Sequence, residues 1–284
     1  MDEVGLGKQL QAARKNAGLT QQDLCHKAGL SYSTLAKIER GAIKSPSIFT
    51  IQSIAAALGV SLNELMGDHG PAAAAPKKYR SKSGIRFVYF DINGCLVRFF
   101  HRAFTQLAAD TGANADIIET TFWHYNDAVC RGEMPLADFN QAMAKQLRVA
   151  DLDWQAYYMA AVDPIKEMHD LVRWAAEYYD VGLLSNIMPG FIEAMLAGGL
   201  LPNVNYAAII DSSKTGAIKP EPGIYEAAQH YTNCDPSEVL LVDDSRANIM
   251  AAEKFGWHVL WFDDYRPEES SARVRSALEP DTAI

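Results

Sequence analysis

Short apolar runs recur through the last two-thirds of the chain, and they end in polar residues. The runs are RFVYFDIN, VGLLSN, AAIIDSS and VLLVDD. Mostly apolar runs of this kind are expected of parallel strands that are buried on both faces of a sheet. The pattern therefore predicts an α/β fold for residues 85–284, with a Rossmann-like, doubly wound parallel sheet.

The first 66 residues have a different pattern, in which apolar positions recur about one helical turn apart. We expect five short helices within residues 6–66. Thr20 and Ser31 are candidate N-caps of the second and third helices, and Gly29 breaks the chain between them. This spacing is typical of an all-α helix-turn-helix domain, predicted for residues 1–66.

Residues 67–84 separate these two parts and lack apolar periodicity, so a flexible basic linker is expected there. Residues 1–66 have a net charge of +2, the linker +3 and the remainder −14. A mildly basic arm on an acidic body predicts that only the arm meets polyanions such as DNA. A solvated basic linker would explain the same charges.

The composition excludes several classes of protein. The chain has 284 residues, of which 49% are hydrophobic, and this supports ordinary globular cores in two or three domains. No apolar run reaches the ~18–20 residues of a membrane span, and the N-terminus has no secretory pattern. The four cysteines are far apart, which favours reduced thiols and a cytoplasmic location over a zinc site or a disulfide framework.

Chemically active side chains stand at or just beyond the ends of the predicted strands. They are Asp91, Ser185, Lys219, Asp243 and Asp244. Strand ends of a doubly wound sheet converge on one crevice, so three carboxylates, a hydroxyl and an ammonium would meet there. Such a group can hold a divalent metal ion and a phosphate, with Asp91 as a nucleophile.

Four short motifs in fixed order resemble the haloacid dehalogenase (HAD) superfamily over about residues 85–265. The motifs are Asp-Ile-Asn-Gly from Asp91, Ser185-Asn186, Lys219-Pro220 and Asp243-Asp244. The resemblance implies Mg²⁺-dependent hydrolysis of a phosphomonoester, in which Asp91 becomes an aspartyl-phosphate. It also implies that Ser185, Asn186 and Lys219 bind phosphate, and that the metal is held by Asp91, the carbonyl of Asn93, Asp243 and Asp244.

Asn93 departs from the pattern of most phosphatases in this superfamily, which have a second Asp two residues after the nucleophile. That Asp protonates the leaving oxygen and then activates water, whereas Asn cannot exchange a proton near neutral pH. General acid–base help contributes typically ~10²–10⁴-fold. The site would therefore be slow or limited to good leaving groups, would use another group or water, or would bind a phosphorylated ligand without turnover.

Residues 97–162 resemble the helical cap that this superfamily inserts after the first strand. Caps close over the pocket, exclude water and select the substrate. His101, Arg102, His124 and Arg131 are candidates for reading polar groups of the substrate, and most of the aromatic side chains are expected to form the core of the cap.

The string from Leu19 to Met66 resembles the phage-repressor-type (XRE-like) helix-turn-helix family. The resemblance implies a recognition helix that begins near Ser31. The candidate DNA contacts are Gln21, Ser31, Tyr32, Ser33 and Lys37, with Arg14, Lys27, Arg40 and Lys44 as further phosphate contacts. Such domains usually bind two half-sites, so a homodimer is expected. The alternative is a small helical bundle for protein contact.

Two functional hypotheses follow. The first is a DNA-binding protein with a Mg²⁺-dependent HAD-like phosphatase domain. The second is a transcriptional regulator whose HAD-like domain senses a small phosphorylated metabolite with little or no turnover.

Overall fold

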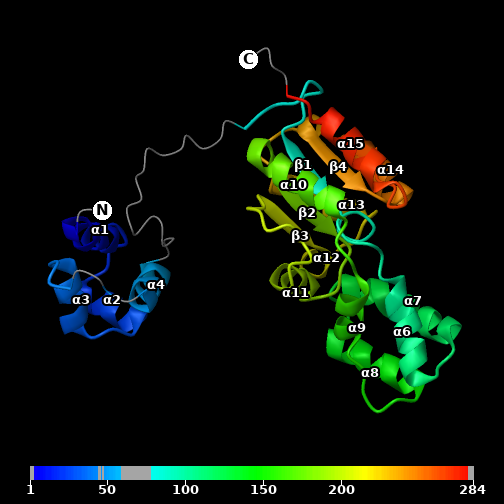
Figure 1. Cartoon of the computed structure of the whole chain (residues 1–284), viewed down its shortest axis with the longest axis horizontal. Helices are drawn as coiled ribbons and strands as arrows, with labels where there is room; N and C mark the ends of the chain where they lie inside the picture. The colour runs from blue at the N-terminus through cyan, green and yellow to red at the C-terminus, as the bar shows by residue number, and fades with distance from the viewer. Residues whose placement is uncertain (1–2, 44–45, 47, 59–77, 281–284) are drawn as a thin grey trace. The chain divides into compact units, whose positions relative to one another are not determined.

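The computed structural model describes residues 3–43, 46, 48–58 and 78–280 (Figure 1). The chain divides into two compact units, Met1–Ala75 and Pro76–Ile284. Within the described ranges, no helix combines the length and the apolar character that a bilayer span requires.

Four helices form the described part of the first unit. They are α1 (Glu3–Asn16), α2 (Gln21–Ala28), α3 (Tyr32–Glu39) and α4 (Ile48–Leu58). They pack around one apolar core, which contains Leu10, Leu24, Leu35, Ile38, Ile51 and Ile54. Because each helix is short, burial of one apolar face in this core rather than helix propensity holds the unit together.

The turn between α2 and α3 has the expected local chemistry. Thr20 caps α2 in a reciprocal capping box with Asp23, and Ser31 caps α3 by accepting a hydrogen bond from the backbone of Thr34. Gly29 ends α2 with a φ of 64°, a conformation that glycine adopts at little cost. The two predicted N-caps and the predicted break are thus confirmed. The fifth expected helix, at residues 61–66, lies outside the described residues.

A five-stranded parallel sheet forms the centre of the second unit. The strands are β1 (Phe87–Phe90), β2 (Asp180–Ser185), β3 (Ala208–Asp211), β4 (Val239–Asp243) and β5 (His258–Trp261). Their order is β3-β2-β1-β4-β5, and all neighbours are parallel. β1, which ends just before Asp91, is therefore the central strand.

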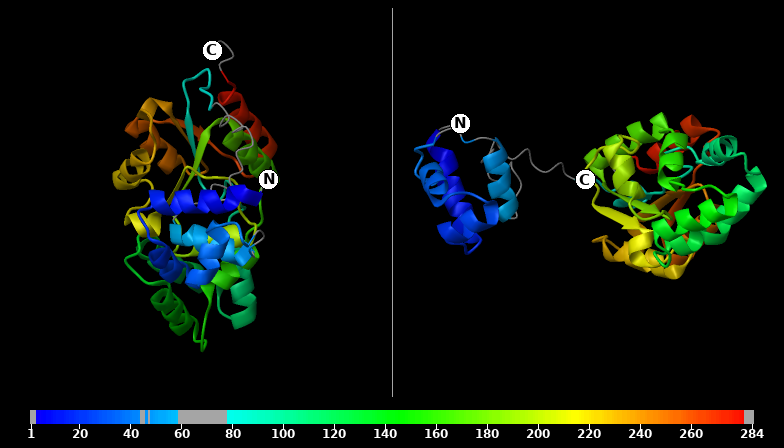
Figure 2. Two further views of the ribbon diagram at one scale, coloured as in Figure 1. Left: turned by 90° about the vertical axis from the view of Figure 1, so that its left-hand side faces the viewer. Right: turned by 90° about the horizontal axis from the view of Figure 1, so that it is seen from below.

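Helices cover both faces of this sheet (Figure 2). They are α10 (Lys166–Tyr178), α11 (Phe191–Ala197), α12 (Ser212–Thr215), α13 (Pro222–His230), α14 (Arg246–Phe255) and α15 (Pro267–Ala277), with a 3₁₀ turn at Pro236–Glu238. Val88 and Phe90 of β1 share an apolar cluster with residues of α10 and α15. Phe87 and Tyr89 pack in a second cluster with residues of α13 and α14. This alternation, which places successive side chains on opposite faces, confirms the predicted doubly wound α/β fold.

Along the chain, four further helices follow β1 and precede α10, where a cap was expected (Figure 1). They are α6 (His101–Thr111), α7 (Ala115–Cys130), α8 (Leu136–Leu147) and α9 (Trp154–Ala161). Their shared core is aromatic, since the ring centroid of Trp154 lies 5.3 Å from that of Phe104 and 4.8 Å from that of Phe122. The prediction that most aromatic residues of this segment form its core is confirmed.

The expected linker falls partly outside the described residues, and its described end lies against the second unit. Lys78 Nζ donates to the carbonyls of Ala176 and Tyr179, at 2.9 and 2.7 Å. Tyr79 stacks on Tyr178 with ring centroids 5.1 Å apart. Residues 78–84 are therefore anchored to the body.

Candidate active site and DNA-contact surface

Asp91 follows the central strand and is held at the carboxyl end of the sheet. Its backbone N–H donates to the carbonyl of Val242 on β4 at 3.0 Å. The residue is only 6% exposed. The strand ladder therefore fixes the backbone of the predicted nucleophile, and its carboxylate is almost removed from water.

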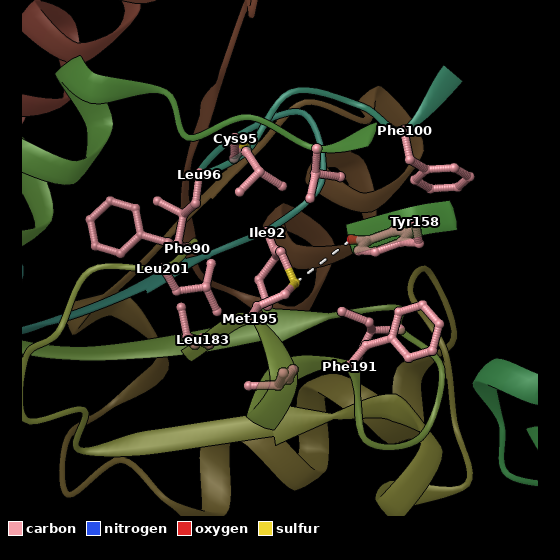
Figure 3. Packing of buried hydrophobic residues seen from close by; sticks show 14 of the residues in the cluster. Phe90, Ile92, Cys95, Leu96, Phe100, Tyr158, Leu183, Phe191, Met195 and Leu201 are labelled. Carbon is pink, nitrogen blue, oxygen red and sulfur yellow. Dashed lines mark hydrogen bonds between the residues drawn. The ribbon is translucent and has the colours of Figure 1, made fainter. Parts of the chain in front are cut away.

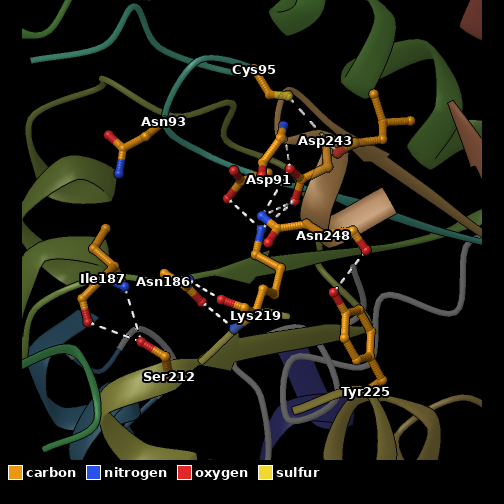
Figure 4. A network of polar contacts seen from close by, with 12 residues as sticks. Asp91, Asn93, Cys95, Asn186, Ile187, Ser212, Lys219, Tyr225, Asp243 and Asn248 are labelled. Carbon is orange, nitrogen blue, oxygen red and sulfur yellow. Dashed lines mark hydrogen bonds and ion pairs between the residues drawn. The ribbon is translucent and has the colours of Figure 1, made fainter. Parts of the chain in front are cut away.

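Lys219 reaches the same point from the loop between α12 and α13 (Figure 4). Its Nζ lies 2.9 Å from Oδ1 of Asp91 and 2.5 Å from Oδ2 of Asp243. Burial disfavours the charged form of Lys219, but the two carboxylates outweigh it and raise its pKa. The side chain is thus a permanently charged ammonium that bridges two strand ends.

Asn186 positions Lys219. The backbone N–H of Lys219 donates to Asn186 Oδ1 at 2.7 Å, and Asn186 Nδ2 donates to the carbonyl of Lys219 at 2.8 Å. The amide of Asn186, which the sequence offered as a phosphate ligand, is therefore committed to the lysine backbone.

Asp91, Asp243 and Asp244 form an acidic cluster, in which one carboxylate oxygen of each lies within 4.8 Å of the others. Burial, with repulsion from Asp243, raises the pKa of Asp91 to about 6 against the opposing effect of Lys219. Burial and the charges of Asp91 and Asp243 raise the pKa of Asp244 to about 7. Three carboxylates thus share one ammonium, and this excess of negative charge on oxygen donors fits a hard divalent cation such as Mg²⁺.

The three carboxylates do not have the same freedom. Asp243 accepts hydrogen bonds from Ser245 N at 2.8 Å and from Asn248 Nδ2 at 3.0 and 3.2 Å, in addition to its contact with Lys219. The backbone of Asp244 is held by Trp261, whose Nε1 donates to its carbonyl at 2.8 Å. Asp243 is therefore largely satisfied by the protein.

Gly94 makes room for Asp244. A Cβ at this position would overlap Oδ2 of Asp244, and the φ of Gly94 is 76°. Any larger residue would push the carboxylate aside and strain the backbone. The glycine of the Asp-Ile-Asn-Gly motif thus shapes the acidic cluster.

Ser185 ends β2 next to the central strand and has an unusual environment. The residue is 0% exposed, and its Oγ has no hydrogen-bond partner among the described residues. A buried hydroxyl without a partner is costly. A bound anion such as phosphate would supply the missing acceptor.

The side chain of Asn93 is hydrogen-bonded to Tyr158, a residue for which the sequence predicted only a place in the core of the cap. The hydroxyl of Tyr158, on α9, donates to Oδ1 of Asn93. The same hydroxyl lies 3.8 Å from Sδ of Met195 (Figure 3). Burial raises the pKa of Tyr158 well above its ordinary value. The two residues are 65 positions apart, and no local pattern links them.

Both residues line a cavity of about 20 Å³ between the cap and the sheet. Its other walls include Phe100, Asn126, Trp154, Asn186, Met188 and Phe191. The four polar residues of the cap that were expected to read a substrate do not line it. Arg102 instead bonds to Ala161 and Asp163, and Arg131 to Glu221. The histidine at 101 packs on Phe99, and that at 124 packs on Tyr125.

Most candidate DNA contacts lie on the surface of the first unit. Ser31, Tyr32, Ser33 and Lys37 are all accessible to solvent, and Tyr32 is 54% exposed. Ser31 also caps α3, so its hydroxyl already has partners. Gln21 is half-buried, and its Nε2 donates to Oε2 of Glu39 on α3 at 2.7 Å.

Arg14, expected as a phosphate contact, is instead part of the protein interior. It is 8% exposed, and its Nε donates to Oε1 of Glu39 at 2.7 Å. A second bond joins its Nη2 to Oε2 of Glu39 at 3.1 Å. This bidentate pair joins α1 to α3, so Arg14 cannot reach DNA. Lys27 and Arg40 are exposed, and Lys44 lies outside the described residues.

Family models match both parts of the chain. Residues 10–65 match a model described as helix-turn-helix, and residues 85–256 match one described as haloacid dehalogenase-like hydrolase.

Curated relatives match a part of the chain. The immunity repressor protein of Bacillus phage phi105 is 38% identical over 77 residues, which cover 27% of this chain and 53% of that protein. An uncharacterised HTH-type transcriptional regulator of Bacillus subtilis, RghRB, is 37% identical over 84 residues, which cover 29% of this chain and 60% of the relative. The chain thus spans little more than half the length of these relatives.

Two solved structures share the fold of the second unit. One is a HAD family enzyme of Bacteroides thetaiotaomicron, an aspartate-to-alanine variant in complex with magnesium and inorganic phosphate. It has a TM-score of 0.55 and 20% identity, and the match covers 63% of this chain and 94% of that one. The other, a predicted HAD-like family hydrolase of Porphyromonas gingivalis, has a TM-score of 0.56 and 21% identity, with 67% and 98% covered.

Proposed function

The chain belongs to the haloacid dehalogenase-like hydrolases, and we propose that its second unit cleaves a small phosphomonoester with the help of Mg²⁺, through an aspartyl-phosphate on Asp91. One observation supports this most strongly. Asp91, Asp243, Asp244 and Lys219 meet at the carboxyl ends of two neighbouring strands.

The choice of metal ligands follows from the number of hydrogen bonds that each carboxylate already accepts from the protein. Asp91, Asp244 and the backbone carbonyl of Asn93 would hold Mg²⁺, with Asp243 as a neighbour that is already hydrogen-bonded to the protein. The ion would offset the repulsion between the carboxylates and the incoming phosphate.

The remaining steps belong to side chains of the protein. A carboxylate oxygen of Asp91 attacks phosphorus while the bond to the leaving oxygen breaks, and the leaving oxygen takes a proton from water. A water molecule then attacks the aspartyl-phosphate, which releases inorganic phosphate and restores the carboxylate of Asp91. The ammonium of Lys219 stabilises the negative charge on the transferring group, and Ser185 Oγ donates a hydrogen bond to a phosphate oxygen. The cap shields this reaction from bulk solvent.

The experiment is a panel of phosphoesters with Mg²⁺, read by release of inorganic phosphate. Asp91→Asn should lower the rate by about a thousandfold or more. Asp170→Asn is the matched control, because that exposed carboxylate pairs with Arg173 on the surface of α10. Phosphate release that survives in Asp91→Asn would contradict the proposal.

For the first unit, we propose that it binds double-stranded DNA as a homodimer of a cytoplasmic protein. The helix-turn-helix match and the exposure of Tyr32, Ser33 and Lys37 on α3 support this. DNA affinity should fall steeply as salt rises, because phosphate contacts release counterions. An association that does not respond to salt and has no operator preference would contradict it.

A second candidate function is favoured by the amide at position 93. In this alternative the hydrolase unit is a weakly active or inactive sensor of a small phosphorylated metabolite, whose binding changes DNA affinity. Asn93→Asp discriminates between the two functions, because a restored carboxyl should raise phosphatase turnover only if the proton shuttle is the missing part. Ligands that change DNA affinity without any turnover would favour the sensor.

A further inference from the structure

The amide of Asn93 has a defined orientation. Because the hydroxyl of Tyr158 donates to Oδ1, that oxygen is engaged and Nδ2 is the part of the amide that can meet a ligand. Asn93 also lines the cavity between the cap and the sheet. The pair can therefore offer an N–H to a leaving group, but an amide exchanges no proton near neutral pH, and the hydroxyl proton of Tyr158 is already directed at Oδ1 of Asn93.

The other polar groups around Asp91 are engaged as well. The ammonium of Lys219 is held between Asp91 and Asp243, at 2.9 and 2.5 Å from their carboxylate oxygens. Asp243 accepts bonds from Asn248, Ser245 and Lys219. Asp244 is the freest of the three carboxylates and is the one that we assign to the metal. Among the described residues, no side chain is left in position to activate a water against phosphorus.

The cavity restricts the leaving group. At about 20 Å³ it has room for about one water molecule, so with the cap in this position only a small leaving group can be enclosed. Its walls are mainly aromatic and apolar, with three asparagine amides. No Lys, Arg or His is among the described residues that line it, so a leaving group would be met by the N–H groups of asparagine amides and not by a cationic side chain.

From these observations we infer that the phosphoryl donor is a small acyl phosphate, and that the phosphoryl group remains on Asp91 as a long-lived aspartyl-phosphate. The inference rests on the proposed function, since it uses the same nucleophile, and it replaces rapid hydrolysis by storage.

The chemistry of this step balances without a proton. A carboxylate oxygen of Asp91 forms a bond to phosphorus, and the bond between phosphorus and the acyl oxygen breaks. The leaving group departs with the electron pair as a carboxylate, which needs no general acid. Nδ2 of Asn93 donates a hydrogen bond to that developing charge. One acyl phosphate is exchanged for another, so no further energy source is required.

The experiment uses the full chain with acetyl phosphate and Mg²⁺, quenched in acid and measured by intact-protein mass spectrometry. We expect a gain of one phosphoryl group on the wild type, its release by hydroxylamine, and no gain in Asp91→Asn. After removal of the donor, Asn93→Asp should shorten the lifetime of the label by ~10²–10⁴-fold. Asn114→Asp, at an N-cap in the cap helices, is the matched control and should leave the lifetime unchanged. Circular dichroism verifies that each variant is folded.

The outcomes separate this inference from the proposed function. Repeated phosphate release that depends on Asp91, with no accumulated label, would overturn the storage of phosphate and leave the hydrolase intact. A label that persists in Asp91→Asn would show phosphorylation elsewhere and overturn the inference. Neither label nor turnover, with acetyl phosphate or with the phosphoester panel, would overturn both.

Tyr158→Phe tests the positioning role of the hydroxyl. Loss of the bond to Oδ1 lets the amide rotate, so the label should form about tenfold more slowly. Its lifetime should remain that of the wild type, because Tyr158 carries no proton in this scheme. A much longer lifetime in Tyr158→Phe would identify the hydroxyl as the group that activates water, and would overturn the assignment.

Discussion

Each unit of this protein buries a cation against carboxylate, and the two sites differ in charge balance. In the helix-turn-helix unit, Arg14 meets Glu39 alone in a bidentate pair. Burial opposes ionisation of Glu39, but hydrogen bonds from Arg14 and Gln21 outweigh it and lower its pKa. In the hydrolase unit one ammonium, Lys219, faces three carboxylates.

The pKa shifts of the carboxylates therefore have opposite signs. The pKa values of Asp91 and Asp244 rise to about 6 and about 7, whereas that of Glu39 falls. In the Arg14–Glu39 pair the two charges neutralise each other, so the pair needs no further ion and stabilises the fold. An excess of buried negative charge, as at Asp91, Asp243 and Asp244, lacks a neutralising cation and is expected where a cation must bind. Four predictions test this contrast.

The largest effect is expected from Arg14→Met, which leaves Glu39 buried without its partner. The first unit should lose about 3–5 kcal/mol of stability, because an uncompensated buried charge is costly. Arg14→Met combined with Glu39→Leu should recover much of this loss. Far-UV circular dichroism follows the helices. All five tryptophans lie in the second unit, so tryptophan fluorescence should not change. A fluorescence transition that shifts equally would contradict an effect confined to the first unit.

The second prediction concerns pH and Mg²⁺. Asp91 and Asp244 have folded pKa values above the ordinary 3.8, so the folded state binds more protons and the second unit should lose stability as pH rises from about 4 to 7. The loss should be on the order of a few kcal/mol without metal. For the first unit the sign is opposite, since the lowered pKa of Glu39 removes stability as pH falls below about 4.5.

Mg²⁺ should reverse the loss in the second unit, and more strongly at pH 8 than at pH 5.5, because protons compete with the ion for the carboxylates. Thermal unfolding followed by tryptophan fluorescence measures both effects, with NaCl at equal ionic strength as the control. Equal stabilisation at the two pH values would contradict a site built on these carboxylates.

The third prediction is that Gly94→Ala weakens Mg²⁺ binding by about tenfold to a hundredfold. The new Cβ would displace Oδ2 of Asp244 and strain the backbone. Titration calorimetry measures the affinity. Gly112→Ala is the matched control, because that glycine also has a positive φ but a Cβ added there would meet nothing within 4 Å. An unchanged affinity in Gly94→Ala would remove Asp244 from the metal site.

The smallest effect is expected from Lys37→Ala on the accessible face of α3. If Lys37 contacts a phosphate, DNA affinity should fall by roughly 1 kcal/mol and the slope of log K against log salt by about 1. Lys145→Ala on the exposed face of the cap helix α8 is the control. Arg14→Met, which acts through folding, should instead abolish binding without a defined change in that slope.

The features that the sequence predicted correctly are those with a local cause. Thr20, Gly29 and Ser31 are caps and breaks because their own backbone and side-chain chemistry favours those positions. The strand ends could be placed because buried parallel strands are apolar throughout and stop at polar residues. Convergence of Asp91 with Asp243 then followed from the rule that strand ends of a parallel sheet share one edge.

The pairing of long side chains could not be predicted in this way. Arg14 looked like a phosphate contact and lies in the interior, while Arg102 and Arg131 looked like substrate ligands and bond to the protein itself. A long flexible cation finds whichever carboxylate or carbonyl the fold brings near, and its sequence neighbours do not indicate which one.

Sequence alone determined the α/β fold, the helix-turn-helix and the set of acids at the strand ends, since these depend on residue type and on short-range order along the chain. Only the tertiary structure decided that Tyr158 holds Asn93, that Asn186 holds Lys219 and that the cavity is small. These contacts join segments up to 65 residues apart. Their geometry depends on how the cap and the loops pack, which is a property of the whole unit.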